Sequence, residues 1–287
     1  MIQFNPLSIN AQDISNQGIL SAAATGLSDF ILHKGADVDR IFGISGINPE
    51  LLLSPTLSLQ LTNYCEVLEQ SAKLSHCDNF GLHYGQQFHP KALGLIGYIG
   101  LCSASLEDAL KNMTSHFNLH QKDTLCRMVE VNDAYRFDYQ VQHGAILSRR
   151  QDAELTVGMF MNVIREVLGT HYSPREIHFE HPRPEFWQEH SKLFNASVFF
   201  DQPFNSILIA KSDLKTAMPQ SDPLLLTMML DTLKILNTQS QSQSLTNQVR
   251  AHIQQDLIHG EPNLEKVALD LHTVSYTHLR AHETRGN

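Results

Sequence analysis

Two histidines four residues apart are the nearest approach to a linear metal-binding motif in this sequence. His116 and His120 have the spacing of a helical ligand pair, but the residues between them lack the glutamate of an HExxH motif. Ser45 lies in Gly43-Ile44-Ser45-Gly46, whose second glycine comes one residue too early for a nucleophile elbow. The sequence therefore predicts no catalytic residue, no metal ligand and no cofactor.

A polar cluster at residues 149–154 is the stronger candidate for a binding site. Arg150, Gln151 and Glu154 stand at the start of a very apolar segment that predicts a helix over residues 153–168. Polar groups beside an apolar wall are what a small-molecule site uses to orient its ligand, so these three are the candidate binding residues. The structural alternative is an Arg150–Glu154 pair at i,i+4 spacing, and polar clusters of this kind are more often structural.

The composition is that of a globular protein with one large domain and a smaller one. The chain has 287 residues, of which 42% are hydrophobic and 18% charged. Its net charge of −9 argues against a protein that binds nucleic acid along its whole chain, because such a protein would normally be basic. The four cysteines form no CxxC pair, which favours reduced thiols in a cytoplasmic protein. The N-terminus lacks the pattern of a signal peptide, and the most apolar run, residues 92–102, is shorter than the roughly 18 residues of a membrane span.

Apolar periodicity predicts an α+β fold in which helices pack on an antiparallel sheet. Helices are expected over residues 19–33, 37–42, 58–74, 105–116, 153–168, 185–194 and 223–236, and a loop or short extension over residues 82–87. Strands are expected at 125–131 and 135–141 around an Asn132-Asp133 hairpin turn, at 176–180, and as a second pair at 198–200 and 206–209. Gly94, Gly97 and Gly100 are expected to line one helix face for close packing, since the GxGxxG pattern of a phosphate loop is absent.

The C-terminal region has the pattern of two short helices that follow a polar linker. Residues 237–244 are rich in serine and glutamine, which is typical of a linker. In residues 245–272, Gly260 ends the first expected helix and Asn263 is a candidate N-cap for the second. Residues 245–273 therefore predict the start of a helix-turn-helix domain, in which a following helix would enter the DNA major groove.

Several of these segments together resemble AraC-type transcriptional regulators with an N-terminal arabinose-binding-like domain. The resemblance is carried by LGLIGYIGLCSASLEDAL at 93–110, by residues 178–225 and by the C-terminal helices, and it covers roughly residues 10–272. It implies that residues 1–236 bind a small-molecule effector and form a homodimer, and that the full-length protein binds promoter DNA. It also implies that Arg150, Gln151 and Glu154 occupy a position where Arg-Gln followed by Glu recurs in the family.

The sequence departs from that family after residue 273, where the DNA-reading helix of the helix-turn-helix is expected. Ser275 and Thr277 are the candidate DNA-binding residues, but the apolar periodicity stops after Leu279, so residues 274–287 are interpreted as a non-native tail and the domain as truncated. Residues 245–272 contain two basic and four acidic residues, a net charge of −2, which predicts poor binding to phosphates. Two hypotheses remain: a transcription regulator with an incomplete DNA-binding domain, and a stand-alone effector-binding and dimerisation module.

Overall fold

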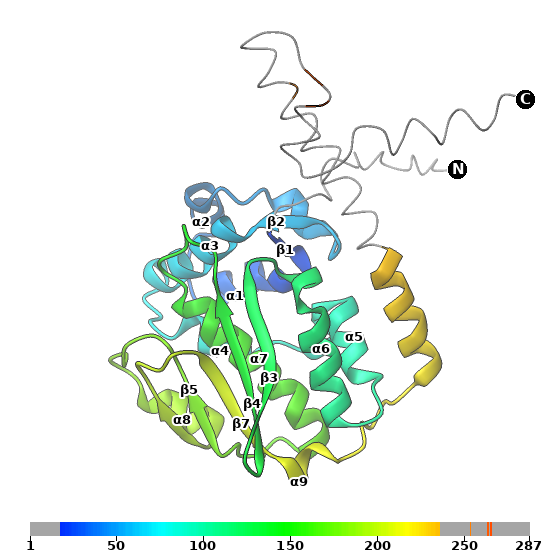
Figure 1. Ribbon diagram of the computed structural model, residues 1–287. Coiled ribbons are helices and arrows are strands. Elements are labelled where there is room, and N and C mark those ends of the chain that lie inside the picture. The colour runs from blue at the N-terminus through cyan, green and yellow to red at the C-terminus, as the bar shows by residue number, and fades with distance from the viewer. Residues whose placement is uncertain (1–17, 236–252, 254–262, 264, 266–287) are drawn as a thin grey trace, which may run out of the picture. The chain divides into compact units, whose positions relative to one another are not determined.

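A five-stranded sheet forms one layer of the computed structural model (Figure 1). Across the sheet the strands are β3 (Thr124–Val131), β4 (Ala134–Val141), β7 (Asn205–Ala210), β5 (Glu176–His178) and β6 (Ser197–Phe199). The predicted β3–β4 hairpin is confirmed, and Asn132 adopts φ 53° at its turn, a conformation that asparagine tolerates well. The two strands pair in register from Thr124 opposite Val141 to Val131 opposite Ala134.

The second predicted strand pair is wrong in its pairing. β7 is antiparallel to β4 on one side and to β5 on the other, so β5 separates β7 from β6. β6 is parallel to β5, and the sheet is therefore mixed rather than wholly antiparallel. A parallel pair needs a crossover, and α8 (Gln188–Phe194) lies between these two strands in the chain. Strand periodicity predicted where the strands lie but contained no information on which neighbours they choose.

The structure describes residues 18–235 together with Ile253, Asn263 and Glu265. The remaining helices of the first part are α1 (Leu27–His33), α2 (Val38–Ser45), α3 (Leu61–Leu74), α4 (Phe80–Gln87), α5 (Leu95–Leu101), α6 (Leu106–His120), α7 (Arg150–Leu168) and α9 (Lys211–Leu214). Three short 3-10 helices are η1 (Ser21–Ala24), η2 (Pro49–Leu53) and η3 (Pro90–Leu93), and β1 (Gly18–Leu20) pairs with β2 (Ser58–Gln60) in a small second sheet. A further helix covers residues 223–235.

The helix α7 is the centre of the hydrophobic core. It packs on β4 and β7 on one side and on α3 and α4 on the other, which Figure 1 shows as a helix behind the sheet. Its long apolar stretch is buried on nearly all faces, as expected for a helix enclosed between two layers. Phe160 packs against Phe137 of β4, with the two rings tilted by 38° and their centroids 4.1 Å apart. The helix begins at Arg150 rather than at 153, so all three candidate binding residues lie within its first two turns.

Residues 82–87, for which the sequence predicts a loop or short extension, belong to α4 instead. The two glycines of this helix lower its intrinsic helix propensity, and they are needed for packing. A Cβ atom on Gly81 would lie 2.0 Å from the carbonyl oxygen of Gln151, and one on Gly85 would lie 2.6 Å from that of Leu155. On the α7 side, a Cβ atom on Gly158 would lie 3.0 Å from the carbonyl carbon of Gly85. The backbones of α4 and α7 therefore approach more closely than any residue with a side chain would allow.

Two of the N-terminal helices predicted from periodicity are shorter than expected. The segment 19–33 begins as β1 and η1 and becomes helical only after Gly26, which adopts φ +78° and so interrupts the helix. The segment 58–74 begins as β2 and becomes α3 at Leu61. Both differences arise because the first residues of each segment pair with each other across the small sheet.

The three regularly spaced glycines have two different roles. Gly97 and Gly100 lie in α5, where a Cβ would meet the Pro90 carbonyl oxygen at 1.9 Å and the Met113 sulfur at 2.5 Å. Close packing at these two positions is therefore confirmed. Gly94 instead precedes the helix with φ +61°, so glycine is needed there for the turn between η3 and α5. Ser105 caps α6 by accepting a hydrogen bond from the Asp108 amide, and that helix continues to His120, beyond the predicted end at residue 116.

The chain divides into two compact units, Met1–Lys234 and Ile235–Asn287. In the second unit, Ile253 and Glu265 are helical, and the Asn263 side chain accepts a hydrogen bond of 2.8 Å from the Glu265 amide. This bond agrees with the predicted N-cap. Apart from these three residues, the predictions for the linker 237–244, the helix-turn-helix 245–273, the tail 274–287, and Ser275 and Thr277 lie outside the described residues.

All four cysteines are free thiols, two of them buried and two half-buried. Among the described residues, no helix is both long enough and apolar enough to cross a bilayer.

Candidate functional site

Arg150 joins the start of α7 to the segment that precedes α4. Its Nε donates a hydrogen bond of 2.8 Å to Glu154 Oε1, which is the i,i+4 pair of the structural alternative. The guanidinium also donates to both carboxylate oxygens of Asp78 at 3.1 Å and to Asn79 Oδ1 at 2.5 Å. The guanidinium of Arg150 is thus hydrogen-bonded to three side chains, one on α7 and two in the segment before α4.

Gln151 fastens the same two helices from the buried side. Its Oε1 accepts a hydrogen bond of 2.7 Å from the Gly81 amide, and its Nε2 donates one of 2.9 Å to the Asp78 carbonyl oxygen. The Gln151 amide donates to Glu69 Oε1 at 3.0 Å. Because an unpaired buried amide would cost free energy, these bonds account for a glutamine that is only 2% exposed. In this structure the side chain of Gln151 pairs with a backbone amide at the N-terminal end of α4.

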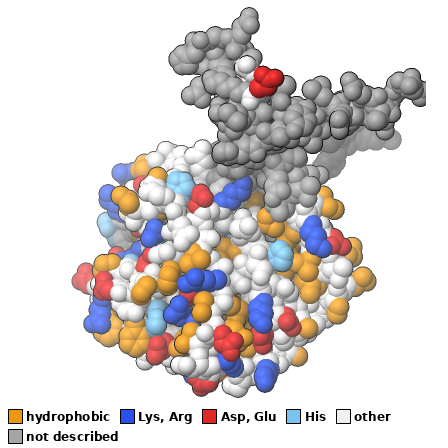
Figure 2. All heavy atoms as spheres, viewed as in Figure 1, with side chains coloured by type: hydrophobic (Ala, Val, Ile, Leu, Met, Phe, Trp, Pro, Cys, Tyr) orange, Lys and Arg blue, Asp and Glu red, His pale blue; other side chains and the backbone are white. Residues whose placement is uncertain are grey.

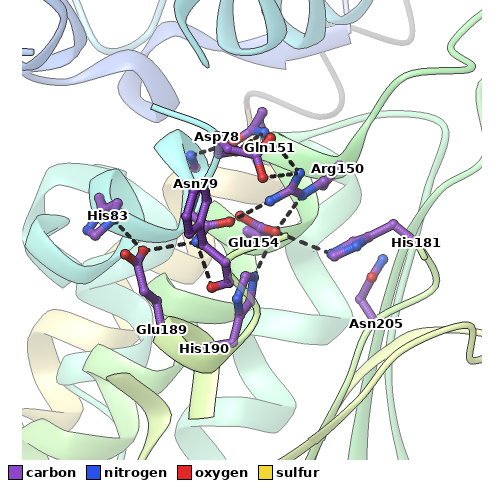
Figure 3. Close-up of polar contacts among 12 residues, drawn as sticks. Asp78, Asn79, His83, Arg150, Gln151, Glu154, His181, Glu189, His190 and Asn205 are labelled. Carbon is purple, nitrogen blue, oxygen red and sulfur yellow. Dashed lines mark hydrogen bonds and ion pairs between the residues drawn. The ribbon is translucent and has the colours of Figure 1, made fainter. Parts of the chain in front are cut away.

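Glu154 is fully buried and lies at the centre of a group of polar side chains (Figure 3). Its Oε1 is 2.8 Å from His190 Nε2 on α8 and 3.4 Å from His181 Nε2 in the loop after β5. Burial alone would raise the pKa of Glu154, but the His190 hydrogen bond and the charge of Arg150 outweigh it and hold this pKa below its ordinary value. The structure thus brings together three of the described ionisable groups that could share a metal ion.

The sequence did not identify His181 or His190 as site residues. They lie 27 and 36 positions after Glu154 on two other elements, so no linear motif connects them to it. The pair that the sequence did single out is separate from this cluster. His116 Nδ1 is 2.8 Å from the Asn112 carbonyl oxygen of its own helix, and His120 is buried, which lowers its pKa to about 4.

A cavity of about 530 Å³ opens between α1 and α4. Its apolar wall is a row of three aromatic rings, in which Tyr84 stacks on Phe30 and meets Phe88 edge-on. Asp29 and His33 supply polar groups at its lining. The volume and this combination of an aromatic wall with a few polar groups are typical of small-molecule sites. Arg150, Gln151 and Glu154 do not line the cavity.

A much smaller cavity of about 10 Å³ lies deeper in the core, against α7. Asp152 and His120 both line it, and Tyr139 donates a hydrogen bond of 2.5 Å to Asp152 Oδ2. Gln121 Nε2 in turn donates to the Tyr139 hydroxyl at 2.7 Å. Burial raises the pKa of Asp152 to about 7, although the Tyr139 hydrogen bond opposes this shift. The space holds a single water molecule at most, so it is a polar void in the core rather than a ligand site.

Comparisons with known proteins agree on one kind of protein. Residues 35–218 match the family model described as the arabinose-binding domain of AraC transcription regulator, N-terminal. The ornithine utilization regulator of Pseudomonas aeruginosa is 22% identical over 274 residues, which are 91% of this chain and 77% of that protein. The crystal structure of the transcriptional regulator CdpR from Pseudomonas aeruginosa superposes with a TM-score of 0.53 at 16% identity, over 90% of this chain and 80% of that one. The structural match shows a shared fold.

Proposed function

Because this chain belongs to the AraC-type transcription regulators with an N-terminal arabinose-binding domain, we propose that it controls promoter activity in response to a small-molecule effector. The observation that carries the effector part is the aromatic-walled cavity between α1 and α4, half of whose lining residues lie within the matched region. A DNA-binding regulator shares a compartment with the chromosome, so the proposed location is the cytoplasm. The proposed DNA-binding part is the helix-turn-helix start at residues 245–273, joined by the linker 237–244.

The proposed effector site is the cavity, and we propose that Arg150 and Gln151 at the start of α7 stabilise one of its walls. Arg150 and Gln151 hold the N-terminal end of α4, and the C-terminal half of that helix lines the cavity through Tyr84. A rigid α4 would keep the aromatic wall preorganised for a ligand. Direct effector binding by Arg150, Gln151 and Glu154 stays a competing prediction.

Homodimer formation is part of the same proposal. Leu224 and Met228 lie one turn apart on the helix at residues 223–235 and are 73% and 60% exposed. Exposed apolar side chains at helical spacing favour packing against another helix. The second candidate function, a stand-alone effector-binding and dimerisation module, needs the same cavity and the same surface but no DNA contact.

A thermal-shift screen tests the effector site. Ornithine is the first compound, since a relative's name refers to it, followed by other amino acids, arabinose, fatty acids and aromatic acids. A true ligand at 100 times its Kd would stabilise the fold by about 2.7 kcal/mol. Ala92→Trp would fill the cavity and abolish the shift, whereas Leu147→Trp, at a position 90% exposed and outside the cavity lining, would leave it unchanged.

The two proposed effector positions predict different outcomes. Arg150→Lys keeps the charge but loses the planar fork that contacts Asp78 and Asn79. A ligand whose shift survives Ala92→Trp but disappears in Arg150→Lys would place the effector at the polar cluster and contradict the cavity assignment.

A further inference from the structure

Three buried side chains from three separate elements converge on one point. Glu154 comes from α7, His181 from the loop after β5 and His190 from α8, and their nearest ligand atoms all lie within 4.8 Å of one another. Glu154 and His190 are fully buried, and His181 is 9% exposed. Figure 3 shows the two imidazoles pointing at the carboxylate from different sides. Phe179 and Phe200 pack against both rings and form the apolar surroundings of the cluster.

The hydrogen bonds of this cluster leave three buried side-chain atoms without a partner among the described residues, namely His181 Nε2, Glu154 Oε2 and His190 Nδ1. His181 Nδ1 lies 2.9 Å from the Pro182 carbonyl oxygen, and a carbonyl oxygen only accepts, so this nitrogen carries a proton. The Nε2 lone pair of the neutral ring then faces Glu154 Oε1 at 3.4 Å, and Nε2 has no hydrogen-bond partner. Glu154 Oε2 is also buried without one. Two lone pairs that face each other in a buried site repel unless a cation lies between them.

The orientation of the His181 ring suits a metal ion. A neutral imidazole whose Nδ1–H is held by a backbone carbonyl is the arrangement in which histidine presents Nε2 to a metal ion.

We propose that Glu154, His181 and His190 bind one divalent transition-metal ion, with zinc as its first candidate. Two imidazoles and a carboxylate are common ligands of Zn²⁺, and a water molecule would complete a tetrahedral set. Zinc bonds of about 2.0 to 2.1 Å place tetrahedral ligand atoms roughly 3.3 Å apart. The His181–Glu154 separation of 3.4 Å already fits, and the His190–Glu154 separation of 2.8 Å would have to widen by roughly half an ångström.

Arg150 is compatible with such an ion. It donates one hydrogen bond to Oε1 of Glu154 and is itself balanced by Asp78, so a lone pair of Oε1 and the unpaired Oε2 stay available to an ion. Outer contacts of this kind orient a ligating carboxylate. Without a metal, Arg150 and His190 would still hold Oε1, but Oε2 and His181 Nε2 would have no hydrogen-bond partner among the described residues. The bound ion would tie α7 to α8 and to the loop after β5, whether or not the chain binds an effector or DNA.

Metal titration of the full chain, first stripped with a chelator, tests this site. Co²⁺ and Zn²⁺ are the probes, read by visible absorption and by equilibrium dialysis. The expected result is one ion per chain and a rise in Tm of roughly 5 to 10 °C at 100 times Kd. His181→Gln and His190→Gln are expected to weaken binding at least roughly 100-fold. His178→Gln is the matched control, because His178 pairs with Glu176 outside the cluster and its loss would leave binding unchanged.

The chain has 16 histidines, so the variants separate this site from incidental binding. Absence of stoichiometric binding by the wild-type chain overturns the proposal, as does binding that persists in both cluster variants. If circular dichroism shows that the variants do not fold, X-ray absorption of the wild-type cobalt complex decides. Two imidazoles and one carboxylate oxygen would support the site, and any other ligand set would refute it.

Discussion

Asp152 and His120 line the same small core cavity, and burial shifts their pKa values in opposite directions. The pKa of Asp152 rises from 3.8 to about 7, and that of His120 falls from 6.5 to about 4. Between about pH 4 and 6.5, the folded chain keeps a proton on Asp152 that the unfolded chain has released. Over the same range, the unfolded chain binds a proton on His120 that the folded chain excludes. The two contributions to the pH dependence of stability therefore have opposite signs and cancel.

Each single substitution should uncover the contribution of the other group. In Asp152→Asn, only His120 remains, so the free energy of unfolding should rise with pH relative to wild type by on the order of 1.4 kcal/mol per unit between pH 4.5 and 6. In His120→Gln, only Asp152 remains, so the same quantity should fall by a similar amount. Urea unfolding at several pH values measures both slopes. Slopes of the same sign in the two variants would contradict the opposed shifts.

At this scale, sequence spacing predicts contacts only within one element. The Arg150–Glu154 pair follows from i,i+4 spacing and is present. His190 is 36 residues away from Glu154 and meets it only because α8 packs beside the start of α7. The protonated state of Asp152 is likewise set by burial, which no local pattern around that residue reveals. Whether Arg150, Gln151 and Glu154 contact an effector stays a prediction.

At the scale of elements, the contact between α4 and α7 depends on glycine. Gly81→Ala would place a methyl group 2.0 Å from the Gln151 carbonyl oxygen, so one of the helices must move. Overpacking of a well-packed core costs about 1 to 3 kcal/mol or more, and here it would also strain the Gly81–Gln151 hydrogen bond. We expect Gly81→Ala to lower the free energy of unfolding by at least that amount, as measured by urea denaturation.

Gly43→Ala is the matched control for this prediction. Gly43 lies in the middle of α2, it is exposed, and a Cβ there would have nothing within 4 Å. Alanine at that position should stabilise the helix by up to about 1 kcal/mol, because it removes the backbone entropy of glycine. Equal stability changes in the two variants would show that close packing does not explain Gly81.

The same contact explains which elements the sequence could predict. The helix α7 and the β3–β4 hairpin have strong local signals, namely a long apolar run and alternating strands around a turn. The helix α4 has weak local signals because its glycines allow close packing against a helix about 70 residues away, so the sequence predicts a loop or short extension there. The partner choice of β6 likewise depends on a crossover through α8, which strand periodicity cannot report.

At the scale of the whole molecule, charge bears most directly on DNA binding. The chain has a net charge of −9, and basic and acidic side chains are interspersed on the face of the first unit shown in Figure 2. A phosphate backbone is bound mainly by clustered lysine and arginine, and residues 245–272 contain two such residues against four acidic ones. The proposed DNA-binding region therefore brings little electrostatic attraction of its own.

We expect the 287-residue chain to bind DNA weakly in a gel-shift assay, with a Kd for non-specific duplex of roughly 10⁻⁴ M or above at physiological salt. Replacing Asp256 and Asp270 by lysine changes the charge of residues 245–272 from −2 to +2 and should strengthen this binding and steepen its salt dependence. Equivalent lysine substitutions at Asp37 and Asp39, in and before α2, control for the total charge. Tight, sequence-specific binding by the wild-type chain would contradict the charge argument. It would also favour the promoter-binding regulator over the stand-alone module, because base-specific contacts would then have to supply what the phosphate contacts lack.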